Sequence, residues 1–387
     1  LFRSYTLRDE AGVLCGIYGV HVDDCATGGQ GPKYEQAMQQ LKQRFEFRKW
    51  RIHDGDFCGS RYTQDPQSFE ISMSQSKFAS GIRPLHLSRS RCQDKTALLT
   101  DQEVSCLRAI NGSLNWLSSQ SRPDLSAQVS FSQQSFPHPC VGDAMSANNA
   151  IRRARQHADL CIVFKSIPLE EIAVVCHSDA AYANTKGGAT QGGVIIGFSQ
   201  KRLELGETCD WTPAYWKSHR LPRVVNSILS AEAQSMSTAS SMCEWMSLVL
   251  ADVQYGPCCA HSLWETSRRP PCMLVTDCKS LFDHLKSPSA PSLDDRRTSI
   301  DIIIIRESIR RMSASIRWLP TDRMLADSMT KESADALDLL RACVKVGKYQ
   351  ISPEQDVEWR ANERQRRKEI AEKRAQLCAM LVSLVKS

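Results

Sequence analysis

The stretch IAVVCHSDAAYAN, residues 172–184, carries the strongest signal for the fold. Its apolar residues continue up to Asp179, which is typical of a buried strand. The stretch CMLVTDCKSLFDHL, residues 272–285, repeats the arrangement, with a buried strand, then Asp277, then a helix. Sites form at the carboxyl ends of strands in open α/β sheets. If the two strands are parallel neighbours, Asp179 and Asp277 face each other across one crevice.

The surrounding segments complete a mixed sheet. Further strands are predicted at 192–200, 214–219 and 315–320, and helices at 227–253 and 321–331. The first of these helices carries Glu232 in its first turns, and the second carries Asp327 one turn inside. The order βββαβαβα predicts an α/β fold, a mixed five-stranded sheet with flanking helices. We therefore expect Glu232 and Asp327 to overhang the crevice.

Several carboxylates that converge on one crevice are unstable without cations. Magnesium prefers a few carboxylates together with water and substrate phosphate. Two such ions about 3.5–4 Å apart can activate a water and stabilise the leaving oxygen of a phosphodiester. A structural interpretation stays open for each acid: Asp179 and Asp277 as turn formers, and Glu232 as a favourable charge near a helix N-terminus.

An earlier stretch, GIYGVHVDDCATGG at residues 16–29, sets two adjacent acids beside an apolar run. Val20 and Val22 favour a buried strand, and the residues 27–29 favour the turn after it. Asp23 and Asp24 repel each other, so the pair is held by a cation or left in water. The stretch thus predicts either a solvated hairpin turn or a divalent-metal site at a hairpin.

Composition narrows the class of protein. The chain has 387 residues, 42% of them apolar, which suffices for two or three domains with real cores. A net charge of +6 permits a nucleic-acid partner without demanding one. The sixteen cysteines are scattered, with no CxxC pair, so zinc-finger spacing is absent. No apolar run approaches a membrane span. We expect an intracellular protein of the cytoplasm or nucleus with reduced thiols and no membrane partner.

The motifs SDAAYAN, SAEAQSMS, VTDCKSL and LADSMTK together resemble the ribonuclease H domain of copia-type retrotransposon polyproteins. Upstream, HVDD resembles the reverse-transcriptase YVDD box of that family, with His21 in place of Tyr. FEFRKW, FCGSRYTQ and SLNWLSSQSRPDLSAQVS resemble the segments that follow this box through palm and thumb. The resemblance covers about residues 13–331.

The resemblance implies a role for each acid. Asp179 would bridge two Mg²⁺ ions, which Mn²⁺ can replace, and Asp327 would help to hold the ion that activates water. Glu232 and Asp277 would hold the ion facing the leaving 3′ oxygen. Cys278 stands where the family often has Asn, and Lys279 could instead meet a phosphate as a point charge.

The same resemblance divides the chain. It implies a partial reverse-transcriptase palm (1–100), a helical thumb or connection (101–165) and a ribonuclease H-like domain (168–333). A charged helix at 353–387 follows, either solvated or paired with a partner helix. In the helical part, nucleic-acid contact is expected from Arg152, Arg153 and Arg155.

The implied function is hydrolysis of the RNA strand of RNA/DNA hybrids. The alternatives are an inactive or domesticated nucleic-acid-binding remnant and a structural partner of other retroelement pol chains. Asp23 and Asp24 would be the second half of a polymerase metal site. Because Leu1 precedes that pair by only about twenty residues, we expect no polymerisation by this chain alone.

Overall fold

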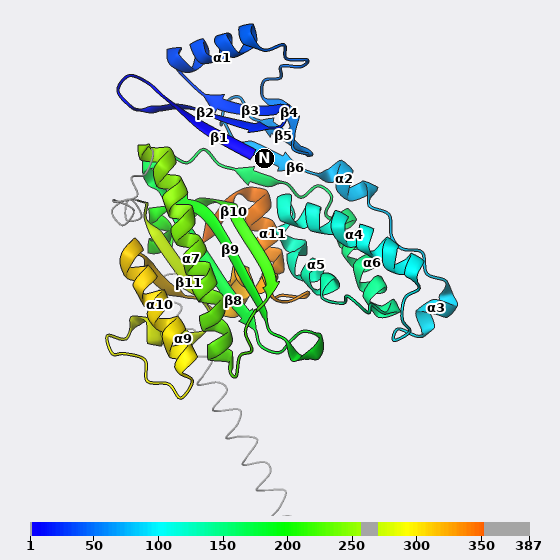
Figure 1. The fold of residues 1–387 in the computed structure, drawn as a ribbon. Helices are drawn as coiled ribbons and strands as arrows, with labels where there is room; N and C mark the ends of the chain where they lie inside the picture. Colours follow the sequence, from blue (N-terminus) through cyan, green and yellow to red (C-terminus); the bar gives the residue numbers. More distant parts are fainter. Residues whose placement is uncertain (1, 257–269, 352–387) are drawn as a thin grey trace, which may run out of the picture.

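The computed structural model describes residues 2–256 and 270–351 and is built around one large sheet (Figure 1). Its strand order is β12-β11-β8-β9-β10-β13. The strands are β8 (Ile172–Ala181), β9 (Gln191–Gln200), β10 (Thr208–Arg220), β11 (Cys272–Thr276), β12 (Ser315–Trp318) and β13 (Lys348–Gln350). The first three are antiparallel, and β11 and β12 run parallel to β8.

The five predicted strands and the α/β class are confirmed, and β13 adds a sixth strand beyond residue 333. It pairs with β10 through Cys209 and Tyr349. The predicted parallel pairing of the first and fourth strands is also confirmed, because Val275 lies opposite His177. Two residues further along each strand, this register sets Asp277 level with Asp179.

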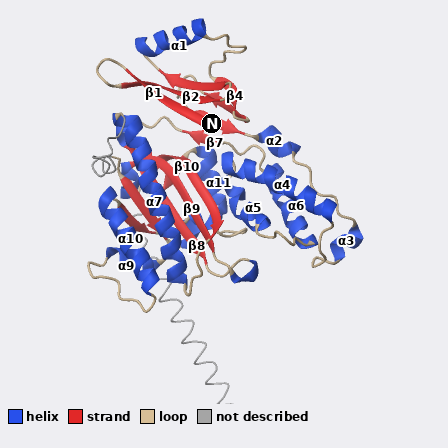
Figure 2. Ribbon diagram, viewed as in Figure 1, coloured by secondary structure: helices blue, strands red, loops and turns tan. Residues whose placement is uncertain are grey.

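Helices lie on both faces of the sheet (Figure 2). The helices α7 (Ile228–Tyr255), α9 (Lys279–Lys286) and α10 (Arg296–Met312) lie on the first face. There Cys176, Ile196 and Leu274 form a buried core with Met236 of α7 and Ile305 of α10. Alternate strand residues point to opposite faces of a sheet, so the odd-numbered Val175 and Ile195 lie in the second core.

That second core is closed by η7 (Leu325–Met329) and α11 (Leu337–Val346), and η6 (Thr321–Arg323) precedes η7 along the chain. The prediction of one helix over 321–331 is therefore wrong, since this segment forms two separate 3-10 turns. All five residues of η7 are buried, so packing against the sheet, rather than helix propensity, sets its conformation.

A helical unit lies beside the sheet (Figure 1). It comprises α4 (Asp101–Gln120), η1 (Pro123–Leu125), α5 (Ser126–Gln133) and α6 (Val141–Gln156). Thr100 caps α4 in a capping box with Glu103. Trp216 of β10 donates a hydrogen bond to the Ser118 carbonyl at 2.7 Å, which joins the sheet to α4.

The N-terminal part forms smaller sheets. β1 (Phe2–Arg8), β2 (Leu14–His21) and β3 (Asp24–Gly29) make one, partly covered by α1 (Pro32–Arg44). β4 (Asp54–Phe57), β5 (Ser60–Gln64), β6 (Ile71–Ser74) and β7 (Ile162–Phe164) make another, followed along the chain by α2 (Ser76–Gly81) and α3 (Arg89–Gln93). The turn predicted at 27–29 lies instead at Val22 and Asp23, and residues 24–29 are a strand.

Among the described residues, no helix has the length and apolarity to cross a membrane. All described cysteines are free thiols. The charged helix predicted at 353–387 lies outside the described residues.

Candidate metal centre

Three acids from three different elements meet at one end of the sheet. Asp179, Glu232 and Asp277 each offer a carboxylate oxygen, and these oxygens all lie within 4.8 Å of one another. Asp179 and Glu232 are only 3% and 4% exposed, and Asp277 is partly buried. The predicted meeting of the two strand-end acids is therefore observed, with Glu232 of α7 added to them.

Local contacts fix each of these acids. Thr321 donates a hydrogen bond to Asp277 Oδ2 at 2.7 Å, and Trp318 Nε1 donates to the Asp277 carbonyl at 2.7 Å. Ser227 caps α7 by accepting from the Ser230 amide at 3.1 Å. One turn beyond Glu232, Ser235 donates to the Asp179 carbonyl at 2.9 Å. This last bond joins α7 to β8 beside the acids.

The electrostatics of the cluster favour protonation in the absence of a cation. Burial, with a smaller contribution from Asp277, raises the pKa of Asp179 to about 7. Burial and the neighbouring acids also raise the pKa of Glu232 well above its ordinary value. Burial raises the pKa of Asp277 as well, although its bond with Thr321 opposes this. A cluster held in this state gains stability from any bound cation.

Asp327 lies outside the group of three but remains connected to it. It is 1% exposed, and Oδ1 pairs with the Lys331 ammonium. Thr330 donates a hydrogen bond to Asp179 Oδ2. Burial opposes the charge of Lys331, yet the bond to Asp327 and the fields of Asp179 and Asp277 leave the pKa of Lys331 raised. Lys331 therefore supplies positive charge beside the acids.

Two carboxylate oxygens of the site are buried without any hydrogen-bond partner, Glu232 Oε2 and Asp327 Oδ2. A buried, unsatisfied carboxylate oxygen is costly. Hard oxygen donors of this kind suit Mg²⁺ or Mn²⁺. The residues present thus fit divalent cations, held by Asp179, Glu232 and Asp277 with Asp327 alongside.

The residues that follow Asp277 are already engaged. Lys279 pairs with Asp283 at 3.0 Å and lies 4.7 Å above the ring of Phe282. The Cys278 thiol lies 3.3 Å from the Ser280 hydroxyl. The predicted phosphate contact of Lys279 therefore requires this exposed ion pair to open.

The three arginines expected to touch nucleic acid differ from one another. Arg153 donates to the Glu332 carbonyl at 2.8 Å, and Arg155 donates to the Ile82 carbonyl at 2.6 Å. Arg152 is exposed. Two of the three guanidinium groups thus hold backbone of their own chain, which sequence alone could not indicate.

Asp23 and Asp24 lie at the tip of the β2–β3 hairpin, where both are exposed. Within residues 2–256 and 270–351, no metal-competent group includes either of them. The structure thus gives an exposed hairpin turn at this pair, and the metal role predicted for it stays a prediction.

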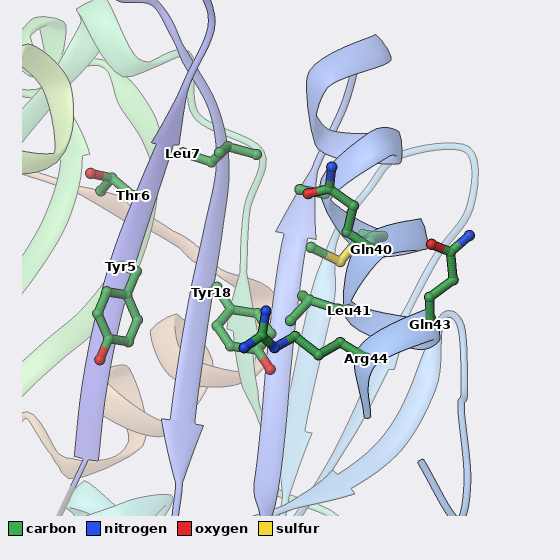
Figure 3. Close-up of a pocket in the computed structure, with 10 residues that line it drawn as sticks. Tyr5, Thr6, Leu7, Tyr18, Gln40, Leu41, Gln43 and Arg44 are labelled. Carbon is green, nitrogen blue, oxygen red and sulfur yellow. The ribbon is translucent and has the colours of Figure 1, made fainter. Parts of the chain in front are cut away.

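Two surface hollows lie elsewhere. One, of about 660 Å³, lies between β1 and α1; Figure 3 shows Tyr5 and Leu7 on one side of it and Leu41 and Arg44 on the other. The second, of about 600 Å³, lies at the starts of α7 and α10. Ser230 and Gln234, which flank Glu232 along α7, line this second hollow, together with Arg296 and Arg297.

Asp301 lies at the second hollow. It is 6% exposed and accepts two hydrogen bonds from Arg223, at 2.9 and 2.7 Å. Gln191, the first residue of β9, is fully buried. It contacts Ser130 and Ser218 at 2.8 Å each, so Gln191 contributes to packing.

Sequence reasoning missed Thr330, Lys331 and Thr321, the side chains that hold the acids. One signal was present, because Lys331 follows Asp327 by four residues, a spacing that allows ion pairs. Thr321 lies 44 residues from Asp277 along the chain, and no local pattern connects the two.

No protein family model and no curated protein matches the chain. Among solved structures, it is similar to ribonuclease H1 from the halophilic archaeon Halobacterium salinarum NRC-1, with 14% identity and a TM-score of 0.27, over 43% of this chain and 93% of that one. It is also similar to the foamy viral protease-reverse transcriptase in complex with double-stranded DNA, with 12% identity and a TM-score of 0.43. That match covers 78% of this chain and 45% of the viral one.

A further foamy viral protease-reverse transcriptase structure, in complex with an RNA/DNA hybrid, is 13% identical with a TM-score of 0.39. The chain spans about a third of that protein and under half of the double-stranded DNA complex. The fold is α/β: three antiparallel strands, two strands parallel to the first, and flanking helices.

Proposed function

We propose that this chain is a metal-dependent endoribonuclease of the ribonuclease H type that hydrolyses the RNA strand of RNA/DNA hybrids. The observation that carries the proposal is the convergence of three acids within 4.8 Å, with a buried Glu232 oxygen left unpartnered. Such a cluster is what two-metal phosphodiester cleavage requires. The motif resemblance supports an origin in a copia-type retrotransposon polyprotein.

Asp179, Glu232, Asp277 and Asp327 would hold two Mg²⁺ ions, with Mn²⁺ able to replace them. When bound, such ions activate a water and stabilise the leaving 3′ oxygen. The chain's own residues orient the acids: Thr330 holds Asp179, and Thr321 holds Asp277. Lys331 offsets negative charge at Asp327.

The remaining assignments follow from the same proposal. Residues 1–100 would be a reverse-transcriptase palm remnant, 101–165 a thumb or connection, and 168–333 the nuclease domain. Partners would be the hybrid and other retroelement pol chains, inside the cell. Arg152 is exposed and, unlike Arg153 and Arg155, donates no hydrogen bond to a carbonyl of the described residues, so we retain it as a nucleic-acid contact.

The test uses the purified full chain and a labelled RNA/DNA hybrid with Mg²⁺. Asp179→Asn and Asp277→Asn keep the side-chain shape and remove a charge, so both should abolish cleavage while hybrid binding stays roughly intact. Asp338→Asn, an acid of α11 whose side chain is 94% exposed, is the matched control and should cleave normally. Retained cleavage in Asp277→Asn would remove that residue from the metal site. A native chain that binds but never cuts would favour the inactive remnant.

A further inference from the structure

The segment that follows η7 is held by side chains from three other elements. The carbonyls of Met329, Thr330 and Glu332 accept hydrogen bonds from Ser218, Asn184 and Arg153, in that order. Asn184 donates at 2.8 Å from the loop after β8, and Arg153 donates at 2.8 Å from α6. Three of the four consecutive carbonyls from 329 to 332 are thus fixed from outside the segment.

This segment has little regular structure of its own. The amides of Thr330 and Lys331 both donate to the Asp327 carbonyl, at 3.1 and 3.2 Å, and no helix continues from there. Because no helical backbone hydrogen bonds fix the segment, its position depends on the side chains that bind its carbonyls. Its own side chains touch the metal site, Thr330 at Asp179 and Lys331 at Asp327.

The helical unit also contacts residues 329–332 indirectly, through Gln191 and Ser218. Gln191 of β9 donates to Ser130 of α5 and to Ser218 of β10, at 2.8 Å each. Gln134 donates to Gln191 Oε1 at 2.9 Å. Ser218 donates a hydrogen bond to the Met329 carbonyl. The side-chain amide of Gln191 binds both Ser218 and Ser130 of α5, so the contact with α5 also fixes Ser218.

We propose that the helical unit (101–157) positions the fourth acid of the nuclease site, and that Arg153 is the positioning residue. The inference rests on the proposed function, because it gives Asp327 and Lys331 their role. A guanidinium that donates to a backbone carbonyl in a partly buried setting holds geometry better than a lysine, since its planar fork is preorganised. Loss of Arg153 frees the Glu332 carbonyl and loosens the segment that carries Lys331.

The experiment compares Arg153→Met, Arg153→Lys and the exposed neighbour Arg152→Met in the full chain. The first readout is thermal: the rise in melting temperature as Mg²⁺ or Mn²⁺ is added, which requires no cleavage. Arg153→Met should need several-fold more metal for half of the full rise, and Arg153→Lys should recover part of the difference. Arg152→Met should need the same amount of metal as the native chain. The second readout is affinity for a hybrid in EDTA, which Arg153→Met should leave within about two-fold.

The outcomes separate the possibilities. A native metal requirement in Arg153→Met overturns the inference. Weaker hybrid binding with a native metal requirement also overturns it and returns Arg153 to the nucleic-acid contacts. If Met at 153 prevents folding, the comparison of Arg153→Lys with the native chain decides alone. A native chain that metal stabilises but that never cleaves the hybrid removes the proposed activity, and the metal titration of the variants still decides on Arg153.

Discussion

At the scale of single residues, the surroundings of Asp179 disfavour the negative charge that a metal ligand carries. The carboxyl group is buried, beside Asp277, and its pKa is raised to about 7. The folded state therefore keeps a proton on Asp179 between about pH 4 and pH 7, where the unfolded chain has lost it. The free energy of unfolding falls with rising pH wherever the folded state binds more protons than the unfolded state. Asp179 therefore stabilises the folded state in acid, and this contribution is lost as the pH rises through 7. Glu232 acts in the same direction.

This predicts a melting temperature, in EDTA, that falls as the pH rises from 5 to 8. Asp179→Asn removes the titrating group and should flatten the fall, and Mg²⁺ should restore the native chain at pH 8. Melts by circular dichroism at four pH values, with EDTA or Mg²⁺, measure both effects. An unchanged slope in Asp179→Asn would mean that the pH dependence arises elsewhere.

The sequence could predict which acids meet but not what holds them. Asp179 and Asp277 follow apolar strands, and parallel pairing brings such positions together whatever the side chains are. The role of Arg153 depends instead on where α6 docks against residues 329–332, a contact 179 residues apart. An arginine on a helix face looks the same in sequence whether it meets a phosphate or a carbonyl.

At the scale of elements, the closeness of η7 to β9 depends on one glycine. A Cβ at Gly193 would lie 2.6 Å from Met329 Cβ, 2.8 Å from Thr330 Cγ2 and 2.9 Å from the Ala326 carbonyl oxygen. Gly193 is also the partner of Asp179 in the β8–β9 ladder. Gly193 therefore allows the segment with the fourth acid to approach the sheet beside Asp179. The sequence marks the glycines but not this contact.

Gly193→Ala should push η7 away from the sheet and weaken metal binding, besides costing roughly 1–3 kcal/mol of stability through overpacking. Gly197→Ala is the matched control in the same strand, because a Cβ there would clash with Trp211 of β10 and should cost a similar amount. Thermal melts with and without Mg²⁺ compare them. We expect the control to keep its rise in melting temperature with metal and Gly193→Ala to lose most of it. Equal metal responses would separate η7 from the metal site.

At the scale of the whole molecule, the helical unit and the sheet share buried charges. Asp124 of η1 binds Arg122 at 2.8 Å and Arg341 of α11 at 3.2 Å. Burial alone would raise the pKa of Asp124, but the two arginines hold it below its ordinary value. The sheet of β1, β2 and β3 contacts the end of α7 through Arg8, which donates a hydrogen bond to the Val253 carbonyl at 2.7 Å.

The residues that resemble a polymerase site are Asp23 and Asp24, which are exposed at the tip of the β2–β3 hairpin. Among the described residues, neither belongs to a group of three ligands close enough to share a metal ion. On a primed RNA template with all four deoxynucleotides, the purified chain should add no nucleotide. Gel analysis of the primer checks this, with a known reverse transcriptase as positive control. Template-dependent extension would show that the hairpin acids are part of a working site.

Several arginines are engaged within the protein and are therefore less available to a bound hybrid. Arg153 and Arg155 bind backbone, and Arg223 binds Asp301. Arg296 and Arg297, at the start of α10, are exposed and line the hollow beside the helix of Glu232. Each phosphate contact contributes roughly −0.7 to −0.9 to the slope of log affinity against log salt. Loss of both arginines should therefore make the slope shallower by roughly 1.4–1.8.

The measurement is hybrid affinity at several salt concentrations for the native chain and for Arg296→Gln/Arg297→Gln. Arg310→Gln is the control on the same helix, since Arg310 is exposed and paired with Glu307 at 2.8 Å, far along α10 from the hollow. We expect the control to keep the native slope. If all three slopes agree, the hybrid does not cross the start of α10. Its backbone must then meet the protein through other cations, with Arg152 and Lys279 the first to test.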